Sequence, residues 1–255
     1  KVRLLVNRGR LVELSTIYGM ILSHNCGHLL EKAYSKIPLE YFDKVFITDD
    51  GSEDNSIQIA NSLGVTVVTS EKSGYGANVK NGLKWAFDNG ADYVVEIHGD
   101  GAQFNPEAVI PAINFIEKDY DFIIGSRFIN KIRTLELEIP KPRYYANILL
   151  SSIDRFILRL PFSEFHTGFR IYNKKFSLVN FDKLSDDYLF SFQIIAYAAY
   201  KKFKCAEVPV ECDYIDDHTS HSYVGATIYA ISHFLTLVQF LFAKIKIKIG
   251  MFVGQ

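Results

Sequence analysis

The sequence predicts a single α/β domain in which helices cover both faces of a mostly parallel β-sheet. Short β-branched or aromatic runs alternate with longer amphipathic segments through the first half of the 255 residues, as in successive β–α–β units. Several of these runs are apolar at every position, which is typical of strands buried on both faces. Tight turns at 50–52 and 89–90 separate the predicted elements.

The predicted elements follow in a regular order up to Arg127. The strands expected in this part are 17–23, 44–48, 66–69, 93–97 and 122–125. The helices expected between them are 27–35, 55–63, 77–88 and 106–118. Pro140 and Pro142 then interrupt the chain, and a less regular part follows. Its expected elements are helices at 144–158 and 188–200 and short strands at 168–172 and 206–211.

The composition limits the classes of function. Lys and Arg number 28 against 29 Asp and Glu, so a formal net charge of −1 gives no general attraction to nucleic acid, and none is expected as a partner. The cysteines, Cys26, Cys205 and Cys212, lack metal-ligand spacing and indicate packed thiols in a reducing, cytoplasmic compartment. No signal peptide is predicted in the first residues, which lack a long apolar core. The expected parts are an N-terminal edge segment 1–14, the main domain 15–222, and an apolar helix with a basic tail 223–255.

The segment 223–243 is almost free of formal charge and precedes three alternating lysines at 244, 246 and 248. Three interpretations stay open. It is a helix of the domain, a helix lying on a membrane surface with the lysines near anionic headgroups, or a true span. Polar residues weaken the third interpretation; they are Ser232, His233, Thr236 and Gln239.

Polar residues gather where the predicted strands end, which is where ligands bind in open α/β sheets. The first cluster is Ser23-His24-Asn25 and the second is Asp49-Asp50-Gly51-Ser52. A carboxylate here can accept from a nucleobase N–H or from ribose hydroxyls. The alternative is that these residues only form turns and cap helices.

Two glycine-containing turns follow. Around Gly74-Tyr75-Gly76, ahead of Asn78, bare backbone can approach a phosphate or pack against a neighbouring segment. The turn 98–103 follows a very apolar strand, and its Asp100 offers the hard oxygen ligand that Mg²⁺ or Mn²⁺ prefers. The alternative there is a polar loop in which His98 is hydrogen-bonded to backbone.

In this order, the clusters closely resemble family 2 inverting glycosyltransferases. The nearest branch is that of the dolichyl-phosphate or polyprenyl-phosphate sugar synthases and related bacterial enzymes. Further matching segments are Gly125-Ser126-Arg127, 163–170, 185–190 with Gln193, and 206–210. The resemblance covers about 16 to 243, and the ordered series is much more specific than any single motif.

The resemblance implies a glycosyltransferase A-type fold, with a Rossmann-like, mostly parallel sheet, flanking helices and a C-terminal apolar helix. The donor nucleotide would lie over the first half of the sheet, with Asp49 or Asp50 at the base or ribose. Other residues of the implied nucleotide-sugar site are Ser23, Asn25, Gly74, Gly76, Asn78 and Asp100. The opening turn departs from the family, because only Asn25 carries over from it.

Asp100 would match the metal-binding aspartate of the family, which implies a divalent cation, Mg²⁺ or Mn²⁺. This turn also departs from the pattern. His98 stands where many relatives have the first aspartate, and Ala102 adds one residue before Gln103. His98, Gln103 and His218 are therefore further candidate metal ligands, the last with a solvated loop as its alternative.

The chemical nature of the acceptor determines which residues assist its attack on the donor sugar. A lipid phosphate needs no general base, and Arg127 and Arg170 would clamp it. A hydroxyl acceptor needs a carboxylate to take its proton, for which Asp187 or Asp186 is the candidate. The alternatives are structural arginines and an aspartate that caps the following helix.

The favoured hypothesis is a metal-dependent inverting transferase that moves a sugar from a UDP- or GDP-linked donor to a lipid-phosphate or other glycan or hydroxyl acceptor. It would be cytoplasmic and peripheral on the membrane, with a homo-oligomer as an alternative use of the C-terminal apolar surface. One competing hypothesis is a nucleotide-sugar-binding module of weakened activity. Another is a sugar nucleotidyltransferase, against which stands the missing glycine-rich basic turn after the first strand.

Overall fold

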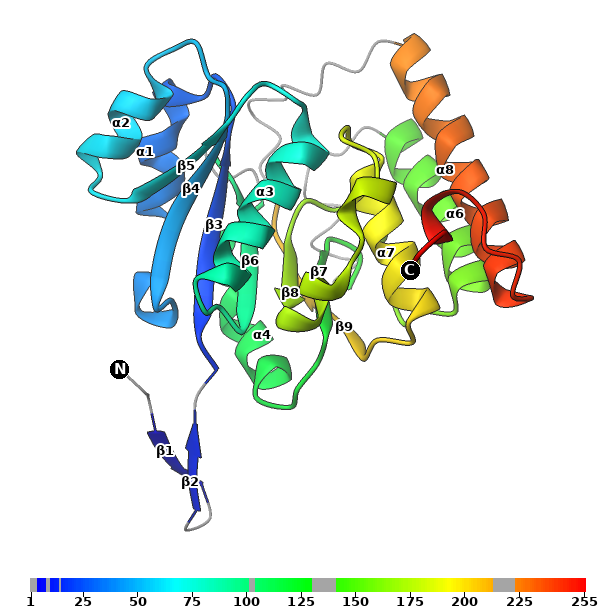
Figure 1. Cartoon of the computed structure of the whole chain (residues 1–255), viewed down its shortest axis with the longest axis horizontal. Coiled ribbons are helices and arrows are strands. Elements are labelled where there is room, and N and C mark those ends of the chain that lie inside the picture. Colours follow the sequence, from blue (N-terminus) through cyan, green and yellow to red (C-terminus); the bar gives the residue numbers. More distant parts are fainter. Residues whose placement is uncertain (1–3, 8–9, 14, 101–103, 130–140, 213–222) are drawn as a thin grey trace.

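A seven-stranded sheet forms the centre of the molecule (Figure 1). The computed structural model describes residues 4–7, 10–13, 15–100, 104–129, 141–212 and 223–255. The strand order is β5-β4-β3-β6-β8-β7-β9, and β8 is antiparallel to both of its neighbours while the remaining pairs are parallel. The strands are β3 (Ile17–Ser23), β4 (Lys44–Asp50), β5 (Thr66–Ser70), β6 (Tyr93–His98), β7 (Phe122–Ser126), β8 (Arg170–Asn173) and β9 (Cys205–Pro209).

Helices connect the strands and cover the sheet. They are α1 (Gly27–Ser35), α2 (Ser56–Ser62), α3 (Tyr75–Asp88), α4 (Val109–Ile116), α6 (Lys141–Leu158), α7 (Phe190–Tyr200) and α8 (Tyr223–Lys244). Short 3₁₀ turns are η1 (Leu39–Tyr41), η2 (Pro106–Ala108), η3 (Lys174–Leu178), η4 (Phe181–Lys183) and η5 (Gly250–Phe252). Figure 1 shows α6 and α8 side by side beyond α7, and α8 packs against both.

Two hydrophobic clusters lie on opposite faces of the sheet because successive side chains of a strand alternate between faces. On β6, Tyr93, Val95 and Ile97 belong to the cluster that includes residues of α1 and α4. Val94 belongs to the other cluster, with residues of α3, α7 and α8. The sheet is therefore buried on both faces, as the uniformly apolar strands predict.

The predicted strands and helices of the main domain are all present. Their boundaries differ from the predicted ones by up to three residues. For example, α6 begins at Lys141 rather than at 144, because a proline in the first turn of a helix replaces an N–H that has no partner within the helix. The predicted edge segment forms a hairpin of β1 (Leu4–Asn7) and β2 (Arg10–Glu13). These strands pair with each other and, within the described residues, make no pairing with the seven-stranded sheet (Figure 1).

Helix α8 has one buried and one exposed face. Leu237, Phe240 and Ala243 are at most 4% exposed and lie in the core, whereas Ile231 and Phe234 are 57% and 61% exposed. By length and composition, Thr227–Lys244 is the one stretch of the described residues that qualifies as a membrane-spanning helix. The buried face against α7 and α6 is that of a helix packed on the domain, and the exposed face leaves the membrane-surface interpretation open.

Candidate active site

Predicted site residues from several strands lie at the carboxyl edge of the parallel strands. Strand register places Ser23 of β3 opposite Asp49 of β4, and Leu22 opposite His98 of β6. Because β8 runs in the opposite direction, its first residue, Arg170, lies at this same edge. The topology therefore brings together clusters that are far apart in the sequence.

Asp49 is tied into the turn that follows its own strand. Its carboxylate accepts hydrogen bonds from the Ser23 hydroxyl at 2.9 Å, the Ser52 backbone N–H at 2.8 Å and the Ser52 hydroxyl at 2.6 Å. The Ser52 hydroxyl in turn accepts from the backbone N–H of Asn25, and the Asn25 side chain accepts from the N–H of Glu53. These contacts are the ones expected if the residues only form turns and cap helices. Nucleotide binding by Ser23, Asn25 and Asp49 stays a prediction.

Asp50 joins strand β4 to the turn before α3. One carboxylate oxygen accepts from the Ser73 N–H at 2.8 Å and the other from the Gly74 N–H at 3.0 Å. Asn78, in the first turns of α3, accepts from the Thr48 hydroxyl at 2.7 Å. Asp50 and Asn78 are 4% and 3% exposed, so both fix the position of α3 relative to the sheet.

The glycines before and within α3 let the segment 185–187 approach closely. A Cβ added at Gly74 would lie 2.7 Å from the Asp186 carbonyl oxygen, and one at Gly76 would lie 2.6 Å from the Ser185 carbonyl oxygen. The Ala77 N–H donates to the Asp186 carbonyl at 3.1 Å. The sequence allowed two interpretations of this turn, approach to a phosphate or packing against a neighbouring segment. The observed contacts are those of packing. The packing also brings both candidate bases beside the start of α3.

Asp186 and Asp187 have different partners. Asp186 forms an ion pair with Lys80 of α3 at 2.5 Å. One oxygen of Asp187 accepts from the Ser185 hydroxyl at 2.7 Å and from the Leu189 N–H at 2.8 Å. That N–H lies just before α7, so Asp187 stabilises the entry to this helix, as the capping alternative predicts.

A buried carboxylate absent from the predicted site, Glu96, lies beneath this edge. It accepts from the Tyr172 hydroxyl at 2.5 Å and from the Tyr75 hydroxyl, and it faces the Arg170 guanidinium at 3.4 Å. Burial acts to raise the pKa of Glu96, but Arg170, His98 and Tyr172 outweigh burial and hold that pKa below its ordinary value. The sequence signal was available: Glu96 is the charged residue inside an otherwise apolar strand.

His98 lies between two carboxylates. Its Nε2 is 3.6 Å from Glu96 Oε1 and its Nδ1 is 3.8 Å from Asp100 Oδ2. Burial acts to lower the pKa of His98, but Asp100 and Glu96 outweigh burial and raise it to about 9. His98 is therefore a cation at neutral pH here, and its proton must leave before either nitrogen can bind a metal.

The end of β6 fits a divalent cation through Asp100. Its side chain is 36% exposed, and carboxylate oxygen and imidazole nitrogen are both donors that Mn²⁺ accepts. The other two candidate ligands, Gln103 and His218, lie outside the described residues.

The two predicted phosphate clamps are buried ion pairs. The Arg127 backbone N–H donates to Glu164 Oε2 at 2.7 Å, and its Nε donates to Oε1 at 2.8 Å. The side chains of Arg127 and Arg170 are each 3% exposed, and Glu164 and Glu96 are fully buried. Both arginines thus hold the structure together, which was the alternative interpretation. Phosphate binding by them stays a prediction that requires these pairs to open.

Fold and site together define a glycosyltransferase of the GT-A class. A doubly covered, mostly parallel sheet carries an acidic turn after β6 and a set of loops at its carboxyl edge. The model of glycosyl transferase family 2 matches residues 20–178, and the chain belongs to this family. It is therefore a glycosyltransferase enzyme, as the ordered motifs predict.

Two archaeal relatives and one bacterial structure illustrate the similarity. The UDP-N-acetylglucosamine–dolichyl-phosphate N-acetylglucosaminyltransferase of Methanococcus voltae is 24% identical over 220 residues, covering 78% of this chain and 86% of that protein. The dolichyl-phosphate hexose transferase of Haloferax volcanii is 24% identical over 162 residues, covering 63% and 66%. The UDP complex of glucosyl-3-phosphoglycerate synthase from Mycobacterium tuberculosis superposes with a TM-score of 0.65 at 16% identity, covering 89% and 80%. A further complex of that synthase contains Mn²⁺ and UDP-glucose.

Proposed function

We propose that this enzyme transfers a sugar from a nucleoside diphosphate sugar to a lipid phosphate at a membrane surface, with inversion at the anomeric carbon. The observation that carries the choice of acceptor is the family membership together with two relatives whose names give dolichyl phosphate. In the structure, one oxygen of Asp187 binds the start of α7 and one oxygen of Asp186 binds Lys80, so each aspartate has a structural role that needs no acceptor hydroxyl.

A phosphate acceptor removes the need for a base. The second pKa of a phosphate monoester is about 6, so its oxygen is largely ionised at neutral pH and attacks without losing a proton. A hydroxyl acceptor would instead need a carboxylate with an open position beside it. The contacts of Asp186 and Asp187 are explained without a role as base, which agrees with a phosphate acceptor.

The donor is proposed to bind across the carboxyl edge. Asp50 holds the turn before α3, so the backbone ahead of that helix is fixed rather than adaptable. We place the divalent cation at Asp100, with His98 as a second ligand once it is neutral. The cation would neutralise the charge that develops on the diphosphate as the sugar bond breaks.

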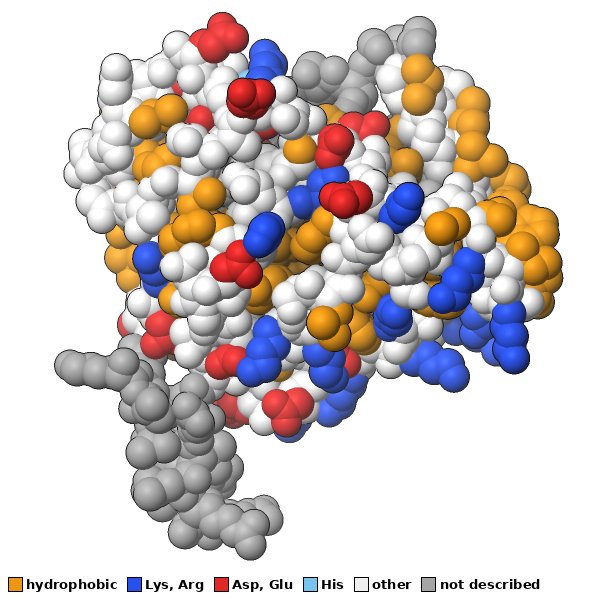
Figure 2. All heavy atoms as spheres, in the orientation of Figure 1, with side chains coloured by type: hydrophobic (Ala, Val, Ile, Leu, Met, Phe, Trp, Pro, Cys, Tyr) orange, Lys and Arg blue, Asp and Glu red, His pale blue; other side chains and the backbone are white. Residues whose placement is uncertain are grey.

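Exposed apolar side chains on α6 and α8 support attachment to a membrane surface. On α6, Leu149 and Phe156 are 63% and 84% exposed, and on α8, Ile228 and Phe234 are 60% and 61% exposed. Figure 2 shows hydrophobic side chains gathered along α8, with Lys and Arg side chains near its C-terminal end. Apolar side chains beside lysines suit the interface of an anionic bilayer. The same face would keep a lipid acceptor near the enzyme.

A donor and acceptor panel tests the proposal. The purified chain is incubated with UDP- and GDP-sugars, Mn²⁺ or Mg²⁺, and dolichyl phosphate in vesicles, and release of nucleoside diphosphate is followed. We expect release that depends on both the metal and the lipid phosphate. An Asp100→Asn variant should lose turnover because it lacks the proposed cation ligand.

The panel also separates the competing functions. Binding of a donor without release under any condition would favour a binding module of weakened activity. Equal release with an alcohol acceptor in place of lipid phosphate would refute the proposed acceptor. Full activity of Asp100→Asn would refute the assignment of the cation site.

A further inference from the structure

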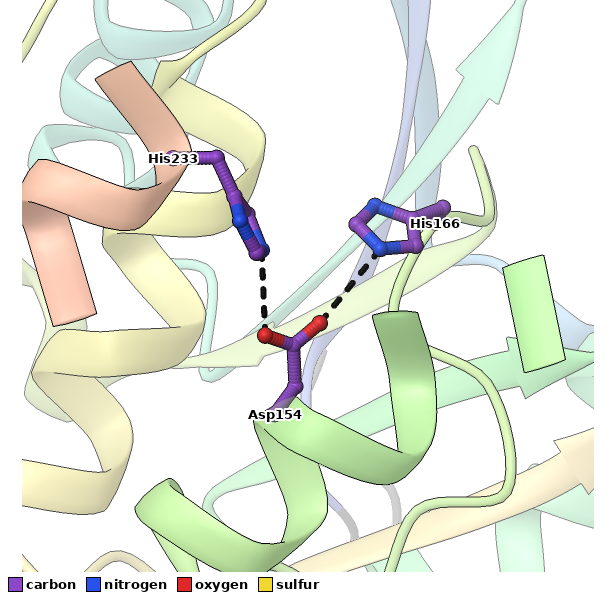
Figure 3. Close-up of side chains that lie close together, drawn as sticks. All are labelled: Asp154, His166 and His233. Atoms are coloured by element: carbon purple, nitrogen blue, oxygen red, sulfur yellow. Dashed lines mark ion pairs between the residues drawn. The ribbon is translucent and has the colours of Figure 1, made fainter. Parts of the chain in front are cut away.

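Three polar side chains converge in the interior between α6, α8 and the loop before β8. They are Asp154 of α6, His166 of the loop and His233 of α8 (Figure 3). Asp154 is fully buried, and the His233 and His166 side chains are 5% and 14% exposed. None of the three belongs to the predicted site, and they share no residue with the pair formed by His98 and Asp100.

The side-chain nitrogens and oxygens of the three residues converge on one small region, as metal ligands do. Each histidine directs its Nε2 at a different oxygen of the carboxylate, His233 at 3.0 Å and His166 at 3.4 Å. Figure 3 shows the two rings on either side of Asp154, with these nitrogens facing it. All the ligand atoms lie within 4.8 Å of one another. Donors bound at about 2.0–2.2 Å to one tetrahedral Zn²⁺ lie about 3.3–3.6 Å apart, so small shifts of these side chains would bring them around one ion.

Ion pairs of Asp154 with the two histidines satisfy the polar atoms of the cluster only in part. Both carboxylate oxygens of Asp154 and the Nε2 atoms of His166 and His233 are buried without a hydrogen-bond partner among the described residues. The contacts are close enough for ion pairs but lack hydrogen-bond geometry. Buried polar atoms that are only partly satisfied are costly, and a bound ion is one arrangement that would complete them.

We propose that Asp154, His166 and His233 bind a transition metal ion, with Zn²⁺ as the representative ion. Two imidazole nitrogens and one carboxylate form a donor set that Zn²⁺ accepts readily, whereas Mg²⁺ prefers oxygen ligands throughout. A fourth position would be taken by water. This site differs in chemistry from the cation site at Asp100, and it does not depend on the proposed function.

The site would fasten α8 to the catalytic domain. Its ligands come from three elements, and the ring of Phe192 in α7 lies against both histidines, with centroid distances of 3.8 Å to His233 and 6.3 Å to His166. A bound ion would fix α8 relative to α6 and to the loop that also carries Glu164. The apolar face of α8 would thereby be held in one orientation relative to the active site.

Metal content and thermal unfolding test the site without any measurement of activity. The full chain is treated with chelator, equilibrated with Zn²⁺, freed of excess and assayed for bound zinc, and its Tm is measured with and without Zn²⁺. We expect about one tightly bound equivalent and a higher Tm with zinc. His233→Gln should lose both effects. A second variant, His166→Gln, covers the case in which the first does not fold.

Two controls separate this site from others. His28→Gln removes an exposed histidine and should behave as the wild type. Asp100→Asn should also keep the zinc, because it leaves all three ligands intact. All variants retain the three cysteines, so zinc bound by thiols would be the same in each. Absence of a zinc-dependent Tm shift in the wild type, or equal zinc in His233→Gln, would overturn the proposal.

Discussion

Replacement of Glu164 by Gln tests whether Arg127 is a structural residue or a phosphate ligand. Glu164 accepts from the Arg127 backbone N–H at 2.7 Å and from its Nε at 2.8 Å, and a second guanidinium nitrogen also binds this carboxylate. Gln preserves the size of the side chain, so no cavity opens. The substitution removes the negative charge and leaves the guanidinium without its ionic partner.

The expected loss of stability is large because both partners are buried. Removal of one member of a buried ion pair costs about 3–5 kcal/mol, since the remaining charge stays desolvated. The exposed pair formed by Lys84 and Asp88 provides the control. Asp88→Asn should cost no more than about 0.5 kcal/mol, the typical value for a helical pair in water. Both changes in the free energy of unfolding are measured by urea unfolding. The m value, which is the dependence of this free energy on urea concentration, should be the same in each variant.

A double variant then separates structure from function. Arg127→Met with Glu164→Leu replaces the pair by apolar side chains of similar size, and we expect it to regain most of the lost stability. If Arg127 only supports the fold, the double variant keeps its transferase activity. Loss of activity in this stable double variant would show that Arg127 binds substrate. A loss below about 1 kcal/mol in Glu164→Gln would refute the argument from burial.

Three further predictions follow. Asp187→Asn, which keeps a capping side chain, should leave kcat within about tenfold for a phosphate acceptor, whereas loss of a general base costs about 10²–10⁴ in a steady-state assay. Gly76→Ala should destabilise the protein by about 1–3 kcal/mol in urea, because its Cβ would lie 2.6 Å from the Ser185 carbonyl; a stabilised variant would contradict the close packing. Burial, and to a smaller extent the negative charge of Asp121, raises the pKa of Cys205 to about 12. At pH 8 the thiolate is therefore only about 1 in 10⁴ of the Cys205 population. The thiol should react with a disulfide reagent only after unfolding, and rapid labelling of Cys205 itself in the native chain would refute its burial.

Elements of the main domain could be predicted from the sequence because their signals are local. Strand β6 is apolar except for Glu96 and His98, so its position follows from its apolar run. The helix expected from 77 begins two residues earlier, directly after Gly74, whose φ of 106° suits glycine. The order of motifs at strand ends then identified the family.

Partners of the site residues could not be predicted because they depend on strand register. Arg170 meets Glu96 only because β8 is antiparallel to β6, and the two residues are 74 positions apart. Arg127 and Glu164 are 37 positions apart. A sequence pattern indicates that an arginine follows a strand, but it does not state which carboxylate lies beside it. The ion pairs at both arginines therefore appear only in the structure.

The carboxylates at the active edge differ in what a ligand would have to displace. Asp49, Asp50, Glu96 and Glu164 are buried, and each is held by protein donors that offset the cost of desolvation. A nucleotide or cation could bind them only by breaking those contacts. The Asp100 side chain, which lies 3.8 Å from His98, is 36% exposed at the end of β6, so a cation reaching it has less desolvation to overcome. This difference in exposure, rather than the number of acidic residues, is why we expect substitution of Asp100 to have the largest effect on metal-dependent transfer, if the cation binds where we propose.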